Sequence, residues 1–241
     1  MPECIHGLEI PLCDACYPKA QPEKAAPAPR TPRAPRSTRV AGVATSRKSI
    51  DPATQRVYHV THISNLESIL DADQLIAGAS PTVDVSTALT RELRLTAEVA
   101  PGRSVADYVP FYLAPTALRW DELRHGAEDE TRWSAAARTS ASVDFVVLVT
   151  TVSALGPDAV VADGDAAASL TRFATGEEII RALTRLHDTS TTDAAEVLAR
   201  EAVPFSSIQL IGVANDRVRD RVRELTSTKV AVYPPWFQAE L

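Results

Sequence analysis

VYHVTHISNL, residues 57–66, is where a regular alternation of apolar and polar residues first appears in the chain. Side chains of a β-strand point alternately to its two faces, so residues 57–63 are expected to form a strand. On that strand His59 and Thr61 share one face, and His62 lies on the other. The strand would thus present a His-x-Thr pair to one side.

A helix is expected directly after this strand. Ser64-x-x-Glu67 is a capping-box pattern and predicts a helix through Asp71. Polar groups at a strand end and a helix N-terminus suit a ribose and a pyrophosphate, which would make the junction a nucleotide site. Two ordinary polar strand residues followed by a helix cap explain the same pattern, and the spacing alone favours that simpler interpretation.

The rest of the body mixes helices and strands. Strands are expected over residues 108–113, 143–152, 206–214 and 229–233, and helices over residues 87–97, 176–187 and 216–225, the last capped by Asn215. The apolar residues expected to face inward on the last two helices are Ile179, Ile180, Leu183, Leu186, Val218, Val222 and Leu225. The order is not a clean βαβ repeat, so an α+β fold is expected.

Charge divides the chain into an acidic body and a basic segment. The chain has 241 residues, 45% of them hydrophobic, which is enough for one sizeable core in residues 51–241. Those residues hold 17 basic and 27 acidic side chains, whereas residues 19–48 hold eight basic side chains and one acidic. Residues 19–50 are rich in Pro, Ala, Arg and Lys without apolar periodicity, so we expect a disordered tether there. The tether either contacts nucleic-acid phosphates or is only a soluble linker.

Several classes of protein are disfavoured by what the sequence lacks. The longest apolar run, VDFVVLVTTV at residues 143–152, is much shorter than the roughly 20 residues of a membrane helix. The N-terminus lacks the layout of a signal peptide, so a cytosolic protein is expected. The sequence has no GxGxxG, Walker loop or HExxH, and residues 51–241 contain no cysteine that could act as a nucleophile.

All three cysteines lie close to a histidine within residues 1–18. Cys4, His6, Cys13 and Cys16 give the pattern C-x-H-x6-C-x2-C, and thiolate and imidazole ligands suit tetrahedral Zn²⁺. A structural zinc knuckle is therefore expected. The alternatives are a disordered tail with reactive thiols and a single disulfide, which the cytosol disfavours.

Five blocks of the body follow one another in a specific order. They are HVTHISNLESIL, RELRLTAEVAP, DYVPFYLAP, DGDAAASLTRF and AAEVLAREAVPF, and over about residues 56–241 they resemble the DarT-type DNA ADP-ribosyltransferase toxins. The resemblance implies an ADP-ribosyltransferase-like fold, in which two small packed sheets with flanking helices enclose an NAD cleft. It also implies transfer of ADP-ribose from NAD to a base of single-stranded DNA, thymine or guanine. Members are usually toxins that a macrodomain antitoxin counters.

The resemblance places the NAD site on the strand and helix of the opening stretch. His59 and Thr61 look like the ribose-side and nicotinamide-side contacts of the family's His-x-Thr/Ser strand. His62 and Asn65 look like further NAD contacts of its THxxN stretch. NAD is thus the expected co-substrate.

The resemblance also implies a catalytic pair. Arg94, in RELRL, matches the region of the family's catalytic arginine, with Arg91 as the alternative, and Glu196, in AAEVL, matches its catalytic glutamate. A carboxylate can stabilise the positive charge that develops on the ribose or take a proton from the attacking base, and an arginine can hold the diphosphate or the base. This chemistry needs no metal, so any zinc would be structural. From the residues alone, Glu196 also fits a solvated helix face and Arg94 an ion pair with Glu98.

Two further segments are expected to shape the substrate side. Many members of the family continue Arg-Ser-Pro-Met-Leu where residues 116–120 read TALRW here, and the polar residues 119–142 predict a lid or a disordered insert. Residues 174–195 are expected to recognise the substrate. Their candidate nucleic-acid contacts, which a solvated helix face explains equally well, are Arg181, Arg185 and His187. Transfer to RNA or protein, or an inactive nucleic-acid-binding module, are the alternative functions.

Overall fold

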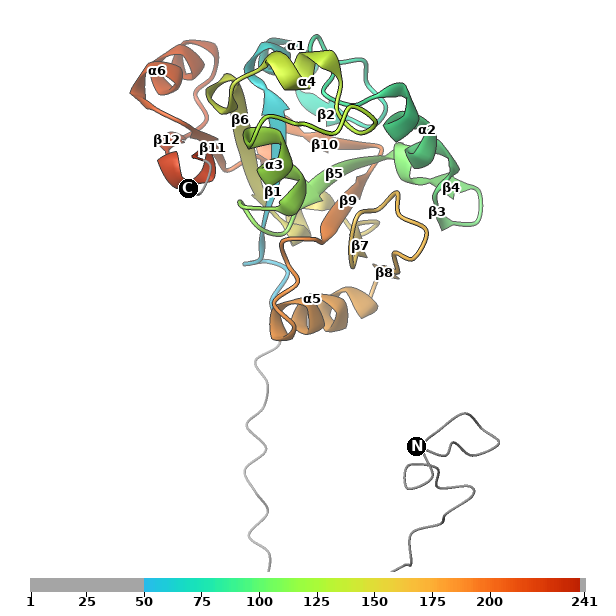
Figure 1. Cartoon of the computed structure of the whole chain (residues 1–241). Coiled ribbons are helices and arrows are strands. Elements are labelled where there is room, and N and C mark those ends of the chain that lie inside the picture. The colour runs from blue at the N-terminus through green and yellow to red at the C-terminus, as the bar shows by residue number, and fades with distance from the viewer. Residues whose placement is uncertain (1–49, 239–241) are drawn as a thin grey trace, which may run out of the picture. The chain divides into compact units, whose positions relative to one another are not determined.

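Strand β1 (Arg56–His62), formed by the opening stretch, lies in the interior of an eight-stranded sheet (Figure 1). The computed structural model describes residues 50–238, and every element in it belongs to one unit, Arg47–Leu241. The expected knuckle of residues 1–18 and nearly all of the expected tether of residues 19–50 lie outside the described part of the chain.

The large sheet has the strand order β12 (Val230–Val232), β11 (Leu210–Val213), β6 (Phe145–Thr151), β1, β5 (Tyr108–Tyr112), β9 (Glu196–Arg200), β7 (Val160–Ala162) and β8 (Phe173–Thr175). Strands β11 and β12 are parallel, and all other neighbours are antiparallel. Two small antiparallel two-stranded sheets accompany it, β2 (Gln74–Ile76) with β10 (Ala202–Pro204), and β3 (Glu98–Ala100) with β4 (Arg103–Ser104).

The sheet consists of two four-stranded halves that meet between β1 and β5. All seven residues of β1 pair with β6, but only Tyr58 pairs with β5, opposite Tyr112. Pro110 accounts for the short contact. Its carbonyl turns toward β1, where it meets the Nδ1 atom of His59 at 2.8 Å, and on that side its nitrogen has no hydrogen to donate to a ladder. The two expected small sheets are therefore the halves of one hydrogen-bonded sheet.

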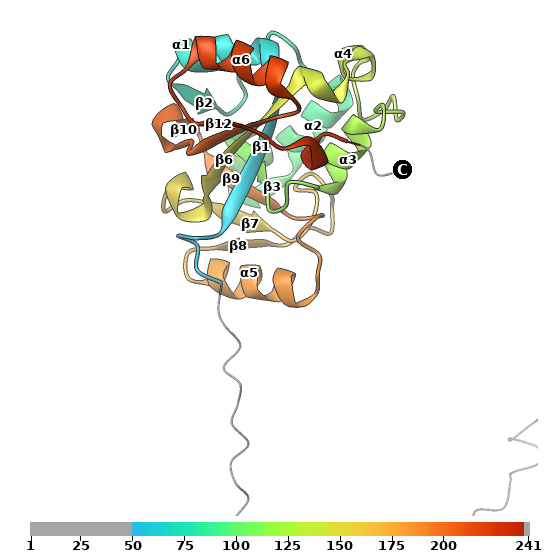
Figure 2. The same cartoon turned by 90° about the vertical axis from the view of Figure 1, so that its left-hand side faces the viewer.

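Helices cover both faces of this sheet (Figures 1 and 2). On one face, α1 (Leu66–Asp71), α5 (Glu178–Asp188) and α6 (Asp216–Leu225) pack on a core that includes Phe111, Leu148 and Val197. On the other face, α3 (Leu118–Arg124) and α4 (Ala135–Thr139) pack on Phe145 and Val147. Burial of apolar surface on both faces stabilises the sheet and explains why β6 is buried along its whole length. The expected α+β fold is confirmed.

The segment 119–142 is part of the core, so a disordered insert is wrong. Its helices α3 and α4 contribute Trp120, Leu123 and Ala137 to the second apolar cluster, and Trp133 between them is buried as well. The indole N–H of Trp120 donates to the carbonyl of Trp236 at 2.5 Å, which ties the segment to the C-terminal end of the described chain. The sequence does not reveal these buried residues, because they are spaced irregularly among many charged ones.

The remaining expected elements occur within a few residues of their predicted positions, including α2 (Ala88–Thr96). Asn215 caps α6 as expected, since its side chain accepts the N–H of Val218 at 3.0 Å. Apart from β12, the pattern does not predict the strands of two or three residues, because so short a segment shows no period. Ile180 and Leu225, expected to face inward, are instead 42% and 43% exposed.

The expected capping box at Ser64 and Glu67 is not formed. Strand β1 passes first into a 3-10 turn, Ile63–Asn65, in which the Nδ1 atom of His62 accepts the N–H of Ser64 at 3.2 Å. Helix α1 begins after that turn and receives no side-chain cap. The side-chain cap at this junction is therefore His62, which caps the 3-10 turn, and not Ser64.

Candidate active site

Glu196 is the first residue of β9 and is only 4% exposed. It lies opposite Tyr112 of β5 on one side and Ala162 of β7 on the other. The AAEVL segment is therefore a strand in the sheet interior, and the solvated helix face that its pattern also allowed is excluded. A glutamate is seldom buried unless it is paired or has a functional role.

Arg94 is the partner of this glutamate. Its Nη1 atom lies 3.4 Å from Oε2 of Glu196, and the two side chains are 19% and 5% exposed. The Nη2 atom of Arg94 is buried, and no group among residues 50–238 accepts a hydrogen bond from it. Such an orphaned donor can bind an acceptor oxygen of an incoming substrate.

The structure also settles which arginine of RELRL reaches the site. Arg91, one turn earlier on α2, points away from Glu196 to Asp84 and Ser86, and its side chain is 51% exposed. Arg94 bonds to Glu196 across 102 positions of sequence rather than to Glu98, which lies on β3 and not on α2. Arg94 rather than Arg91 therefore contacts Glu196, and its catalytic role stays a prediction.

Burial raises the pKa of the Glu196 carboxyl group, and Asp165 raises it further. Arg94 and Arg119 act in the opposite direction because their positive charges favour the carboxylate. Burial and the charge of Glu196 also raise the pKa of Tyr112, so its phenol stays protonated. Arg94, Arg119 and Asp165 also act on Tyr112, which pairs with Glu196 between β5 and β9.

Sequence reasoning missed three members of this cluster: Tyr112, Arg119 and Asp165. Arg119 pairs with Asp165 at 2.8 Å, although 46 positions separate them in the chain. Two of the three lie inside blocks that carry the family resemblance, DYVPFYLAP and DGDAAASLTRF. That was the only signal, because nothing in their spacing connects them with Glu196.

The side chain of His59 connects the two halves of the sheet, because it bonds from β1 to β5. Its Nδ1 atom faces the Pro110 carbonyl, which can only accept, so Nδ1 carries the hydrogen. Burial lowers the pKa of this imidazole more than the carbonyl raises it, so the ring is neutral at neutral pH. It also packs at a tilt on Phe111, with ring centres 5.5 Å apart. The Nε2 atom of this tautomer is left as an acceptor for a substrate hydroxyl.

Asn65 holds a loop in place. Its Nδ2 atom donates to Thr61 Oγ1 at 3.2 Å and to the carbonyl of Val83 at 3.0 Å, while its Oδ1 atom accepts the N–H of Val83 at 2.7 Å. Both amide hydrogens are therefore used. The structure brings Thr61 and Asn65 together as expected, but it directs the asparagine to the segment before α2 and fixes that segment against β1.

His62 is separated from these residues. It lies on the other side of β1 and packs edge-on against Phe145, with ring centres 5.4 Å apart. Burial lowers the pKa of its imidazole, an effect that Asp144 partly offsets. No hydrogen bond or ion pair between described residues connects His62, His59 or Thr61 directly with Glu196. Strand β5 links the two groups, since it bonds to His59 and pairs with Glu196.

The expected recognition segment 174–195 contains β8, α5 and the turn that leads into β9. Helix α5 packs beside β8 at the edge of the sheet (Figure 1). Arg181 and Arg185 are exposed on it, whereas His187 is bonded to Gln55 at 2.8 Å. The turn is held close to the site, because the carbonyl of Asp193 accepts the N–H of Leu118 at 3.0 Å.

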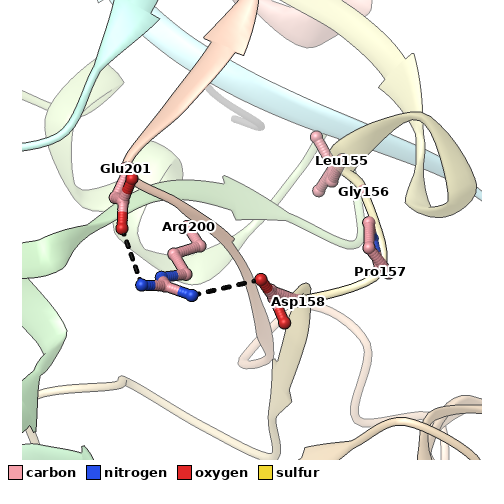
Figure 3. Close-up of a pocket in the computed structure, with 6 residues that line it drawn as sticks. All are labelled: Leu155, Gly156, Pro157, Asp158, Arg200 and Glu201. Carbon is pink, nitrogen blue, oxygen red and sulfur yellow. Dashed lines mark hydrogen bonds and ion pairs between the residues drawn. The ribbon is translucent and has the colours of Figure 1, made fainter.

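The hollow shown in Figure 3 lies away from this cluster. It encloses about 230 Å³ around Arg200, at the opposite end of β9 from Glu196. Arg200 is paired there with Asp158 at 3.2 Å and Glu201 at 2.8 Å. These side chains are largely exposed and pair with one another, so the hollow offers neither a buried carboxyl group nor an unused donor of the kind found at Glu196 and Arg94.

Two further properties concern the described residues as a whole. Residues 50–238 hold no group of three or more His, Cys, Asp or Glu side chains that could bind a metal. None of the helices in this range is long and apolar enough to span a membrane.

Solved structures share this split-sheet fold. Thermus sp. 2.9 DarT in complex with ADP-ribosylated ssDNA matches with a TM-score of 0.65 at 24% identity, over 76% of this chain and 96% of that chain. The same protein in complex with NAD+ matches with a TM-score of 0.62 at 23% identity, over 79% of this chain and 100% of that one. The chain thus has the fold of these two DarT structures.

Sequence comparison gives the family. The family profile described as "ssDNA thymidine ADP-ribosyltransferase, DarT" matches residues 58–238. A DNA ADP-ribosyl transferase of Mycobacterium tuberculosis (strain ATCC 25618 / H37Rv) is 28% identical over 190 residues, which are 70% of this chain and 80% of the relative. One from Thermus sp. (strain 2.9) is 42% identical over 69 residues, or 27% and 33% of the two chains. This chain belongs to the DarT family, so the expected family and enzyme class are confirmed.

Proposed function

We propose that the chain transfers ADP-ribose from NAD to a base of single-stranded DNA. The observation that carries the proposal is Glu196, which is buried on an interior strand of the sheet beside an arginine with an unused donor. Its place in a family described as single-stranded DNA thymidine ADP-ribosyltransferases supports this substrate class.

Each residue of the site has a part in this reaction. Neutral His59 and Thr61 offer acceptor and hydroxyl groups to the sugar and amide of NAD, and the free Nη2 donor of Arg94 suits a diphosphate or base oxygen. As the ribose C1′–nitrogen bond breaks, its electron pair goes to nicotinamide, and the Glu196 carboxylate stabilises the positive charge left on the sugar. A base nitrogen then bonds to C1′, and Glu196 accepts its proton.

The test is transfer from radiolabelled NAD to defined polymers. Thymine-containing and guanine-containing single-stranded DNA, the matching RNA and a protein mixture are incubated with the wild-type chain and with Glu196→Gln. We expect label on single-stranded DNA and a loss of roughly 100- to 1000-fold in Glu196→Gln. Label on RNA or protein alone would redirect the substrate. Oligonucleotide binding without any NAD cleavage would indicate an inactive binding module.

We also propose the biological role that the family resemblance implies, a toxin whose mark a macrodomain antitoxin removes. One solved relative, the DarTG of Thermosipho africanus, is described in complex with ADP-ribose and matches with a TM-score of 0.61 at 19% identity. Induced expression of the wild-type chain, but not of Glu196→Gln, should stop growth. Co-expression of a macrodomain hydrolase should restore growth and remove the label from DNA. We also propose the cytosolic location that the sequence predicts, where the chain would meet DNA.

Zinc binding by Cys4, His6, Cys13 and Cys16 is a separate proposal, because these residues lie outside the described part of the chain. The C-x2-C spacing and the nearby histidine support it. Elemental analysis of the purified full chain should give one zinc per molecule, and Cys13→Ser should lose it. Full transfer activity of Cys13→Ser on short oligonucleotides would agree with a structural metal.

A further inference from the structure

Arg119, on the first turn of α3, is held between a carboxylate and an aromatic ring. Its Nη2 atom donates to Oδ2 of Asp165 at 2.8 Å, and the two side chains are 18% and 30% exposed. Its guanidinium carbon lies 5.7 Å from the ring centre of Trp133. A guanidinium stacked on a ring keeps the N–H groups along its edge free for planar hydrogen bonding.

Both supports of this arginine are themselves fixed. The other carboxylate oxygen of Asp165 accepts the N–H of Ala167 at 3.1 Å, and the Asp165 carbonyl accepts the hydroxyl of Thr171 at 2.6 Å. Trp133 is buried, and its indole N–H donates to Glu122 at 3.3 Å. Arg119 is therefore preorganised, so little side-chain entropy remains to be lost when it binds a ligand.

The guanidinium of Arg119 has unused hydrogen-bonding capacity. A guanidinium carries five N–H donors, and Asp165 is the sole acceptor of Arg119 among residues 50–238. The N–H of the adjacent Leu118 donates to the carbonyl of Asp193, three positions before Glu196, at 3.0 Å, and the charge of Arg119 acts on both Glu196 and Tyr112. Two positive and two negative side chains balance in this cluster: Arg94, Arg119, Asp165 and Glu196. Because no net positive charge is left over to attract an anion, a bound anion needs free N–H donors such as those of Arg119.

We propose that Arg119 binds a phosphate oxygen of a substrate at the mouth of the active site, with Asp165 and Trp133 holding it in position. This inference rests on the proposed function, since both substrates of that reaction carry phosphates. The oxygen belongs either to the diphosphate of NAD or to the backbone of the DNA strand next to the target nucleotide. The bidentate geometry of arginine suits both.

Arg200 provides a matched control. It is also an arginine in an ion pair, but it bonds to two carboxylates, Asp158 and Glu201, and lies at the far end of β9 (Figure 3). A purely structural role for Arg119 would give Arg119→Gln and Arg200→Gln similar consequences. A phosphate-binding role would change a substrate dissociation constant in Arg119→Gln alone.

Two titrations without turnover test the proposal on the full chain. NAD is titrated by calorimetry in the absence of DNA, and a fluorescein-labelled thymidine-containing single-stranded oligonucleotide is titrated by anisotropy at several KCl concentrations. The variants are Arg119→Gln, Arg119→Lys and Arg200→Gln, each checked by thermal melting. We expect about tenfold weaker binding of one ligand in Arg119→Gln, with a smaller loss in Arg119→Lys, which keeps the charge and loses the fork.

The two sources give different results. If the phosphate belongs to NAD, the NAD dissociation constant rises and the salt dependence of oligonucleotide binding is unchanged. If it belongs to DNA, oligonucleotide affinity falls and the slope of log K against log salt decreases by about 0.7. Unchanged constants for both ligands in folded Arg119→Gln and Arg119→Lys would overturn the role of Arg119. Failure of the wild-type chain to bind either ligand would contradict the proposed function itself.

Discussion

At the scale of single residues, the candidate site contains one buried carboxyl group, that of Glu196, whose pKa its neighbours shift. Burial raises the pKa of Glu196, while Arg94 and Arg119 lower it. If the carboxylate is the active form, the transfer rate falls on the acid side as Glu196 becomes protonated. Because its pKa is raised, this fall begins nearer to neutral pH than the ordinary glutamate value of about 4.5 would give.

Removing the charge of Arg94 should move this acid limb. In Arg94→Gln the positive charge that favours the carboxylate is absent, so the pKa of Glu196 rises further and the limb shifts to higher pH, in addition to a lower maximal rate. In Arg94→Lys the charge remains, so the limb should stay close to its wild-type position. The measurement is the pH profile of kcat/KM with NAD and oligonucleotide. A limb that does not move in Arg94→Gln would show that Glu196 does not set it.

The family blocks indicated residues that the structure brings together, whereas residues that join the cluster only through tertiary pairing were not predicted. Glu196 and Arg94 were found through the resemblance, and the structure brings them together. Tyr112 joins them because β5 pairs with β9 in a register that no local pattern encodes. Asp165 is connected to this cluster through its ion pair with Arg119, which lies 46 positions earlier in the chain on α3. Contacts across such separations cannot be read from periodicity.

At the scale of elements, long or strongly patterned segments were predicted well. The strand at VYHVTHISNL, the buried strand β6 and helix α6 with its Asn215 cap all follow local rules. The split between β1 and β5 was not predicted from the residues. In retrospect a proline at position 110 is its cause, since it removes a ladder donor where the two halves part.

Asn65 connects two elements, and its loss should have a measurable cost. Asn65→Ala leaves the N–H and the carbonyl of Val83 without their partner, and we expect the free energy of unfolding to fall by about 2 kcal/mol. Asn215→Ala is the matched control, because it removes one exposed cap hydrogen bond and should cost about 1 kcal/mol. Urea denaturation measures both. Equal losses in the two variants would contradict the role of Asn65 as a clamp.

If that clamp also shapes the NAD site, Asn65→Ala should raise KM for NAD more than it lowers kcat. The loop that Asn65 holds leads directly into α2, which carries Arg94. Displacement of the loop would loosen substrate binding without removing a reacting group. Asn215→Ala should leave both constants unchanged. An equal change of KM in the two variants would show that the effect is one of general stability.

At the scale of the whole molecule, the distribution of charge poses a problem for a DNA-modifying enzyme. Residues 51–241 hold ten more acidic than basic side chains, which repels a polyanion. Residues 19–48 carry eight basic side chains and one acidic one. Since residues 19–49 lie outside the described part of the chain, their role in DNA binding stays a prediction from sequence, with a soluble linker as its alternative.

Four arginines of this segment offer the sharpest test. The quadruple variant Arg30→Gln, Arg33→Gln, Arg36→Gln and Arg39→Gln should weaken oligonucleotide binding and reduce the slope of log K against log salt by up to roughly 2–3, because each phosphate contact contributes about 0.7. NAD affinity should not change. A variant with residues 19–50 shuffled at constant composition should bind like the wild type, since counterion release depends on charge rather than on order. If the slope is unaltered in the quadruple variant, the segment is only a linker. The positive charge that offsets the acidic body must then come from exposed arginines of the body itself, such as Arg181 and Arg185 on α5.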